Sequence, residues 1–185
     1  MLSASDHGSR SAVLSTCGRY RYALERSTGV AGPNVVWVML NPSTADADRD
    51  DPTIRKVVGF SRLHRFGVAM VVNLFAWRET SPRVLRGLLQ GTIGKGPIRA
   101  QTAEGPENER AIRGAVELAE VVICAWGAQP WACAQADRVI PWLAGKRLVC
   151  LGTTKDGSPR HPLMVAYSQP LVPFVRALDA WRGLR

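Results

Sequence analysis

Three polar residues, each at or after the end of an apolar run, have side chains that suit chemistry on a polar ligand. Asn41 follows the run VVWVML, Asn73 lies within VVNLF, and His161 stands in the turn-rich segment after LVCLG. An amide both donates and accepts hydrogen bonds, and a histidine changes its charge near neutral pH. Together these three side chains could bind a polar ligand through hydrogen bonds.

Each of these residues also has a purely structural interpretation. Asn41-Pro42-Ser43 could simply form a turn, because Asn and Ser bond their own backbone and proline restricts φ. His161 could be a solvated loop histidine, and Asn73 could be a core amide with partners inside the protein. Their common placement after predicted strands favours a site.

Alternating apolar and amphipathic segments predict the elements that must position these residues. Nearly continuous apolar runs predict strands buried on both faces at residues 35–40, 68–74, 121–125 and 147–151. Helices are expected at residues 52–66, 107–118, 130–143 and from 170 onward, the first with Asp51 as its N-cap. The remaining expectations are an edge strand at 17–25, a long loop with one short helix at 80–106, and loose residues at 1–12.

This order of elements predicts an α/β fold. We expect a single domain over residues 1–185, a three-layer α/β/α domain with a mostly parallel four-stranded central sheet. In such sheets the ligand crevice lies beyond the carboxyl ends of the strands. Asn41 and His161 follow the first and fourth predicted strands, and Asn73 lies near the end of the second, so we expect all three around one cleft at that edge.

Composition narrows the choice of partner. The chain has 24 Lys and Arg against 15 Asp and Glu, a net charge of +9, which favours a polyanionic partner, above all nucleic acid. No apolar run approaches the ~20 residues of a membrane span, and the opening lacks a secretory signal, so we expect a cytoplasmic monomer without membrane contact. The four cysteines have no metal-ligand spacing, so no metal site is expected.

Four motifs, in order, resemble those of the uracil-DNA glycosylase superfamily. VVWVMLNPST resembles its first motif, an apolar strand ending in Asp-Pro or Asn-Pro, and AMVVNLFAWRET resembles its strand with a base-reading Asn. VVICAWGAQPW and RLVCLGTTKDGSPRHPL resemble its strand with Trp-Gly and its final strand, which leads to a His-Pro-Ser loop. The resemblance is closer to a bacterial and phage branch known only as a domain of unknown function, number sixteen-forty-three of that series.

The resemblance implies a DNA N-glycosylase that excises a damaged or modified pyrimidine and needs no metal or organic cofactor. Asn41 would hold the attacking water, and Asn73 would hydrogen-bond the Watson-Crick edge of an extruded base. His161 would donate to a pyrimidine carbonyl oxygen, because negative charge develops on the base as it leaves. Phe75, or else Trp77, would stack on the base.

Binding to DNA would also need positive charge and a wedge close to these residues. Lys155 and Arg160 flank the histidine loop, and Arg78 follows the second predicted strand, so all three are expected to contact phosphates. Leu163 could insert into the base stack, although it could equally begin a core helix.

Three departures from the superfamily pattern change the expected chemistry. Asn41 stands where uracil-specific members have Asp; an amide cannot take a proton from water, so turnover would be slow or would depend on a nearby carboxylate, and Asp46, Asp48, Asp50 and Asp51 lie just downstream. Ser43 stands where those members have a bulky Tyr, so the base-binding pocket, which would include Ser43 and Asp51, could admit a 5-substituted pyrimidine. Leu163 replaces the serine of the final loop and with it one expected phosphate contact. The acidic stretch around Asp51 could otherwise be a solvated turn.

Two other functions remain open from the sequence. A hydrolase or transferase of the same fold could act on free nucleosides or nucleotides, and it would show activity on monomers with little salt dependence of binding. A non-catalytic nucleic-acid-binding module would instead bind DNA tightly and release no base.

Overall fold

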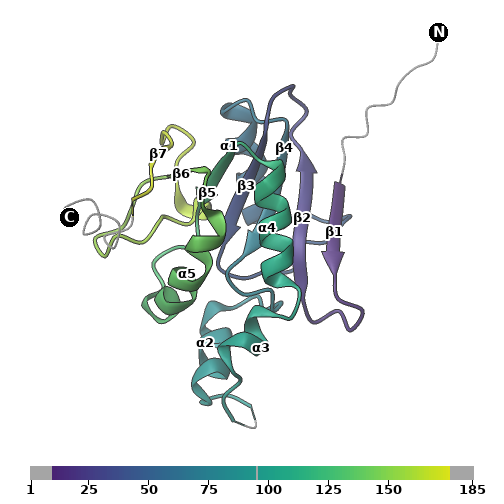
Figure 1. The fold of residues 1–185 in the computed structure, drawn as a ribbon, viewed down its shortest axis with the longest axis vertical. Helices are drawn as coiled ribbons and strands as arrows, with labels where there is room; N and C mark the ends of the chain where they lie inside the picture. Colours follow the sequence, from purple (N-terminus) through teal and green to yellow (C-terminus); the bar gives the residue numbers. More distant parts are fainter. Residues whose placement is uncertain (1–9, 95, 176–185) are drawn as a thin grey trace.

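A seven-stranded mixed sheet runs through the centre of the computed structural model, which describes residues 10–94 and 96–175 (Figure 1). The strands lie in the order β1-β2-β4-β3-β5-β6-β7. Their bounds are β1 Arg10–Leu14, β2 Arg21–Ser27, β3 Asn34–Met39, β4 Val68–Asn73, β5 Val121–Cys124, β6 Arg147–Cys150 and β7 Val172–Pro173. The four strands β4, β3, β5 and β6 run parallel, whereas β1, β2 and β7 pair antiparallel with their neighbours.

The prediction of a four-stranded, mostly parallel sheet is wrong, although the class is still α/β. Within the described residues, β1 pairs with β2, β2 with β4, and β6 with β7 in antiparallel register. Polar residues interrupt β1 and β2, and β7 has only two residues. These three strands therefore carry no continuous apolar signal.

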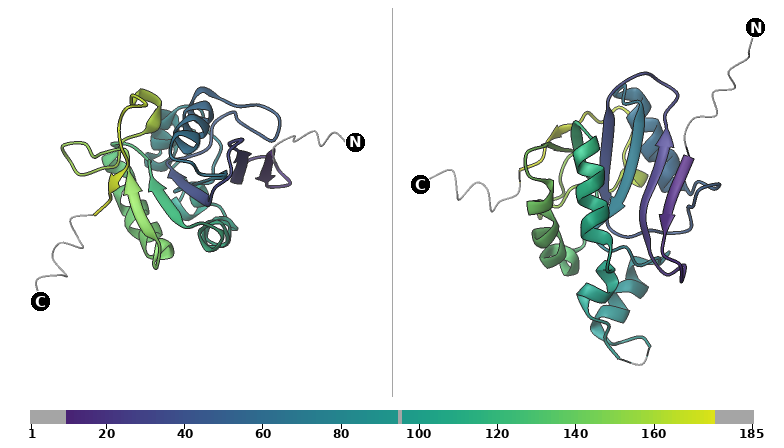
Figure 2. Two further views of the ribbon diagram at one scale, coloured as in Figure 1. Left: turned by 90° about the horizontal axis from the view of Figure 1, so that it is seen from above. Right: turned by 45° about the vertical axis from the view of Figure 1, so that its right-hand side comes forward.

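Helices cover both faces of this sheet. Their bounds are α1 Pro52–Leu63, α2 Pro82–Gln90, α3 Ala100–Glu104, α4 Asn108–Leu118 and α5 Cys133–Val139. α4 and α5 pack on one face and α1 packs on the other, which gives two apolar cores (Figures 1 and 2). Successive side chains of β3 alternate between them, so Val36 contributes to the first core and Trp37 to the second.

Local chemistry explains where two of the helical segments begin and break. α1 begins at Pro52, as predicted, because the side chain of Asp51 accepts a hydrogen bond from the Ile54 N–H at 2.9 Å. The single helix expected over 130–143 is instead three short pieces, η1 Pro130–Ala132, α5 and η2 Ile140–Leu143. Pro141 cannot donate the backbone hydrogen bond that a continuous helix requires.

The remaining expectations about the elements were partly wrong. The long loop expected over 80–106 contains two helices, α2 and α3, which lie together beyond one end of the sheet (Figure 1). The segment expected to form an edge strand at 17–25 contains the start of β2, which lies inside the sheet between β1 and β4. The edge strands are β1 and β7, and β1 begins within the residues expected to be loose. No helix begins at Pro170; β7 lies there, and residues 1–9 and 176–185 fall outside the described part of the chain.

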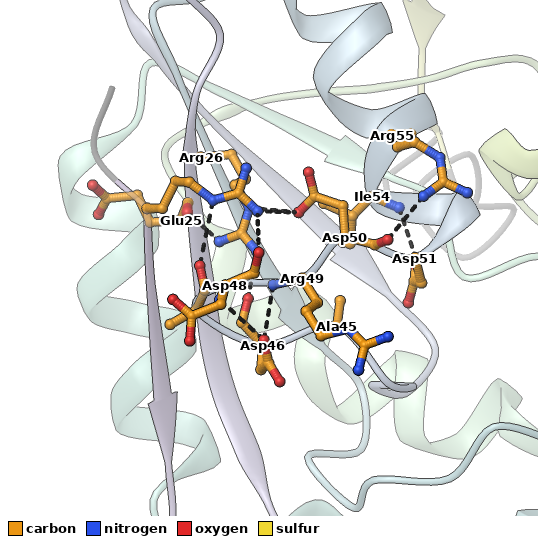
Figure 3. A network of polar contacts seen from close by, with 12 residues as sticks. Glu25, Arg26, Ala45, Asp46, Asp48, Arg49, Asp50, Asp51, Ile54 and Arg55 are labelled. Atoms are coloured by element: carbon orange, nitrogen blue, oxygen red, sulfur yellow. Dashed lines mark hydrogen bonds and ion pairs between the residues drawn. The ribbon is translucent and has the colours of Figure 1, made fainter. Parts of the chain in front are cut away.

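A polar network ties the loop between β3 and α1 to strand β2 (Figure 3). Arg26 of β2 donates to Asp50 Oδ1 at 2.7 Å and to the carbonyl oxygen of Asp46. The carboxylate of Asp46 accepts hydrogen bonds from the backbone N–H groups of Asp48 and Arg49 at 3.0 and 2.9 Å. The acidic residues of this loop are therefore structural partners and not simply a solvated turn.

Candidate functional site

A cavity of about 770 Å³ opens at the carboxyl ends of the parallel strands, where an α/β sheet is expected to hold a ligand. The segments that follow β3, β4, β5 and β6 all line it, together with the start of α1. The predicted site residues in its wall are Asn41, Ser43, Asp51, Asn73, Arg160, His161 and Leu163. The structure thus brings residues from distant parts of the chain around one space of a size typical for small ligands.

Asn73, the last residue of β4, is the most unusual polar group in this wall. Its side chain is 1% exposed, and neither Oδ1 nor Nδ2 has a hydrogen-bond partner. Burying an amide without partners costs free energy, so such a group points to a missing partner. The backbone here is satisfied, because the carbonyl oxygen of Asn73 accepts from Asn108 Nδ2 at 2.9 Å.

Asn41 is held in one orientation by the backbone around it. Its Nδ2 donates to the carbonyl oxygen of Glu79 at 2.6 Å and to that of Pro42 at 3.1 Å. Both contacts use the amino half of the amide. Oδ1 is therefore the half that is left to accept a hydrogen bond from a water molecule or a ligand.

His161 presents a defined tautomer. Its Nδ1 accepts a hydrogen bond from the Leu163 N–H at 3.3 Å, so the proton of the neutral ring lies on Nε2. Burial lowers the pKa of His161, while the negative charge of Asp51 partly opposes that shift. The imidazole is therefore neutral at pH 7 and offers Nε2–H as a donor. Gly127 packs against it, because a Cβ at Gly127 would lie 3.3 Å from the Cβ of His161.

Two carboxylates also lie in the cavity wall. Asp51 uses Oδ1 to cap α1, and Glu79 uses Oε1 to accept from the Ser81 N–H at 3.1 Å. Each carboxylate has a second oxygen and remaining lone pairs, so each retains the capacity to accept a proton or a further hydrogen bond. Ser43 is half-buried in the same wall and leaves the space that a larger side chain would fill.

Phe75, Arg78 and Lys155 do not line the cavity, so the structure does not bring these predicted site residues to it. Phe75 is 2% exposed and stacks on Trp131 in the core, with ring centroids 5.9 Å apart. Arg78 donates to the carbonyl oxygen of Gly18 at 3.3 Å. Lys155 is exposed in the turn before the histidine loop.

Because Phe75 is a core residue, Phe75→Ala is expected to lower the free energy of unfolding by about 3–5 kcal/mol. The cause is a cavity left beside Trp131 on the α5 side of the sheet. Urea denaturation measures this loss. A variant with unchanged stability but weakened ligand binding would contradict the core assignment and return Phe75 to the site.

Two charged residues of the wall were missed by the sequence reasoning. Arg21 comes from the start of β2, and its alternation with tyrosines suggested only an edge strand. Glu79 follows β4 by six residues and stands in the motif AMVVNLFAWRET, which was a signal available in the sequence. No comparable signal marks Arg21.

Comparison with known families identifies a match that covers most of the chain. The model of a family described as "Protein of unknown function (DUF1643)" matches residues 21–163, more than half of the chain. The chain belongs to this family. No curated protein and no solved structure matches it. The DUF1643 match runs from Arg21 through Asn41 and Asn73 to Leu163, so it includes nearly all of the cavity wall.

Two further findings concern membranes and metals. Over the described ranges, 10–94 and 96–175, no helix is both long and apolar enough to cross a membrane. In the same part of this DUF1643 chain, His, Cys, Asp and Glu form no group of three or more that could hold a metal ion.

Proposed function

We propose that this protein is an N-glycosidic hydrolase that removes a modified pyrimidine base from DNA. The observation that carries the proposal is the buried, unpartnered amide of Asn73 in the wall of a ligand-sized cavity. The Watson-Crick edge of a pyrimidine presents a donor and an acceptor side by side, which is what a free amide can pair with. The sequence resemblance to uracil-DNA glycosylases supports the same reading.

The proposed reaction divides the work among three residues. Asn73 pairs with the base edge, and His161 Nε2–H donates to a carbonyl oxygen of the base as the bond from its nitrogen to the sugar breaks. The electron pair of that bond leaves with the base, and a water molecule held by Asn41 Oδ1 attacks the sugar carbon. The water must lose a proton, and Asp51 or Glu79 accepts it, because an amide cannot.

Ser43 sets the size of the base that the proposed pocket admits. Ser43→Tyr is expected to reduce action on a 5-substituted pyrimidine by about tenfold or more while sparing unsubstituted uracil, because a tyrosine ring would occupy the space beside C5. The test is the ratio of the rate on the 5-substituted pyrimidine to the rate on uracil. Measuring both rates on one enzyme preparation corrects for any loss of folded protein. Equal losses on both substrates would show that Ser43 does not lie beside C5.

A direct test is incubation of the purified protein with genomic DNAs that carry different modified pyrimidines. Mass analysis of the released bases then identifies the substrate. Release of one modified base, with an abasic site left in the DNA, supports the proposal. Tight DNA binding without any released base would instead indicate a non-catalytic binding module.

One observation favours a second candidate, a hydrolase of free nucleosides or nucleotides. Of the three basic residues expected to contact phosphates, Arg160 alone lines the cavity. A DNA enzyme is expected to lose affinity steeply with salt, since each phosphate contact releases counterions. Affinity for an oligonucleotide over a salt series decides between the two: a steep log-log slope supports DNA, and a flat response with activity on nucleosides supports the alternative.

A further inference from the structure

Strand β2 carries two buried arginines that differ in their hydrogen-bond and ion-pair partners. Arg21 and Arg26 are each 2% exposed. Arg26 lies outside the cavity and has a full set of partners, with Asp50 at 2.7 Å and the carbonyl oxygen of Glu25 at 2.8 Å among them. Arg26 shows how this fold satisfies a buried guanidinium.

Arg21 lines the cavity and lacks such partners. Nη1 donates to the carbonyl oxygen of Ala45 at 2.7 Å, whereas Nε is buried without a hydrogen-bond partner. Among the described residues, no carboxylate lies within ion-pair distance of its guanidinium. A buried charge without a counterion is costly, so folding alone does not explain why an arginine stands here.

The guanidinium nevertheless keeps its charge at neutral pH. Burial lowers the pKa of Arg21 to about 10, and the more distant charge of Asp51 opposes that shift, while Arg78 and Arg26 add to it. At pH 7 the side chain is therefore protonated. It contributes a positive charge, with an unpartnered Nε–H, to the wall that also holds Asn73 and Ser43.

We infer that Arg21 binds an oxyanion carried by the ligand, a carboxylate or a phosphate, and so selects for an anionic pyrimidine compound. The pyrimidine part of this inference rests on the proposed function. Guanidinium groups bind carboxylates and phosphates through charge-assisted, often paired hydrogen bonds. Asp51 and Glu79 lie in the same wall, so the site suits one anionic group and not a polyphosphate.

The oxyanion has two possible sources, and their positions differ. It is either a substituent on the base, next to the space left by Ser43, or the phosphate of a nucleotide. The hydrogen bond from Arg21 to Ala45 places the guanidinium against the loop that carries Ser43, two residues earlier in the chain. That placement makes a substituent on the base the first source to test.

The experiment uses matched ligands that differ in charge but little in shape. Isothermal titration calorimetry on the full-length protein compares uracil-5-carboxylate with uracil-5-carboxamide, and deoxyuridine monophosphate with deoxyuridine. We expect the anion of at least one pair to bind about tenfold or more tightly than its neutral counterpart. A gain in the first pair assigns the oxyanion to the base, and a gain in the second assigns it to the nucleotide phosphate.

Variants then connect that preference to Arg21. Arg21→Gln is expected to abolish the gain, and Arg21→Lys to keep part of it, because the ammonium retains the charge. Arg110→Gln is the control for net charge: it removes one exposed arginine of α4 outside the cavity and should leave the gain unchanged. If Arg21 only supported the loop at Ala45, Arg21→Gln would lower stability but leave the anion preference intact, and the inference would be wrong.

The wild-type comparison decides the matter even if Arg21→Gln does not fold. Absence of an anion preference in both pairs, including absence of binding, overturns the inference. The proposed base excision is measured separately, by release of bases from DNA. Excision without an anion preference would overturn the inference alone, and an Arg21-dependent preference without excision would overturn the proposed function alone.

Discussion

Asn73→Leu is expected to stabilise the fold and to abolish the proposed base excision at the same time. Leucine has the same number of side-chain heavy atoms and the same branching as asparagine but no polar atoms, so the variant removes a buried amide that lacks partners. We expect the free energy of unfolding to rise by about 1–3 kcal/mol, while kcat/KM falls by about 10²-fold or more because the base edge loses both its hydrogen bonds. Urea denaturation and a base-release assay measure the two effects.

A second buried asparagine provides the control for this prediction. Asn108 donates from Nδ2 to the carbonyl oxygens of Asn73 and Leu74 at 2.9 and 3.4 Å. Asn108→Leu therefore leaves two carbonyl groups with fewer partners and is expected to destabilise the fold by about 1–3 kcal/mol, the opposite sign. If Asn73→Leu also destabilised the protein and left activity unchanged, Asn73 would be a structural residue of the core.

His161→Ala is expected to reduce glycosidic cleavage on every substrate by on the order of 10²-fold or more, as removal of an oxyanion donor does. The loss should appear in kcat more than in KM, because the donor acts on charge that develops as the base leaves. Steady-state kinetics on a confirmed substrate tests it. Equal rates for the wild type and the variant would remove His161 from the mechanism.

The buried histidine also gives stability a definite pH dependence. Burial lowers the pKa of His161 in the folded protein below its ordinary value of 6.5, so between these two values the unfolded chain binds more protons. The contribution of His161 to the free energy of unfolding is therefore complete above pH 6.5. It decreases as the pH falls from 6.5 through the lowered pKa of the folded protein. His161→Gln should therefore reduce the loss of unfolding free energy that acid causes. Unfolding measurements between pH 5 and pH 8 would detect this difference from the wild type. The same pH dependence of stability in the variant and the wild type would show that His161 does not have a lowered pKa in the folded protein.

The sequence predicted the parallel centre of the sheet better than its edges. β3 and β4 consist almost entirely of buried apolar residues, and such runs are recognisable without a structure. β2 is buried at only four of its seven residues, and two of these are Arg21 and Arg26. The ion-pair partner of Arg26, Asp50, lies 24 positions later in the chain, so no local pattern could show that this arginine faces inward.

The same reasoning explains which site residues were predictable. Asn41, Asn73 and His161 follow parallel strands, and the ends of parallel strands meet at one edge of the sheet. β2 runs antiparallel to β4, so the residue that reaches this edge is its first one, Arg21. Phe75 was misplaced because the chain turns into the core immediately after β4.

The loop between β3 and α1 carries Asn41, Ser43 and Asp51, and hydrogen bonds from Arg21 and Arg26 hold it against the sheet. Most of the entropy lost in ordering this wall therefore belongs to folding and not to binding. A ligand that enters the cavity therefore meets a wall that folding has positioned. Its affinity depends mainly on contacts that are in position before it arrives.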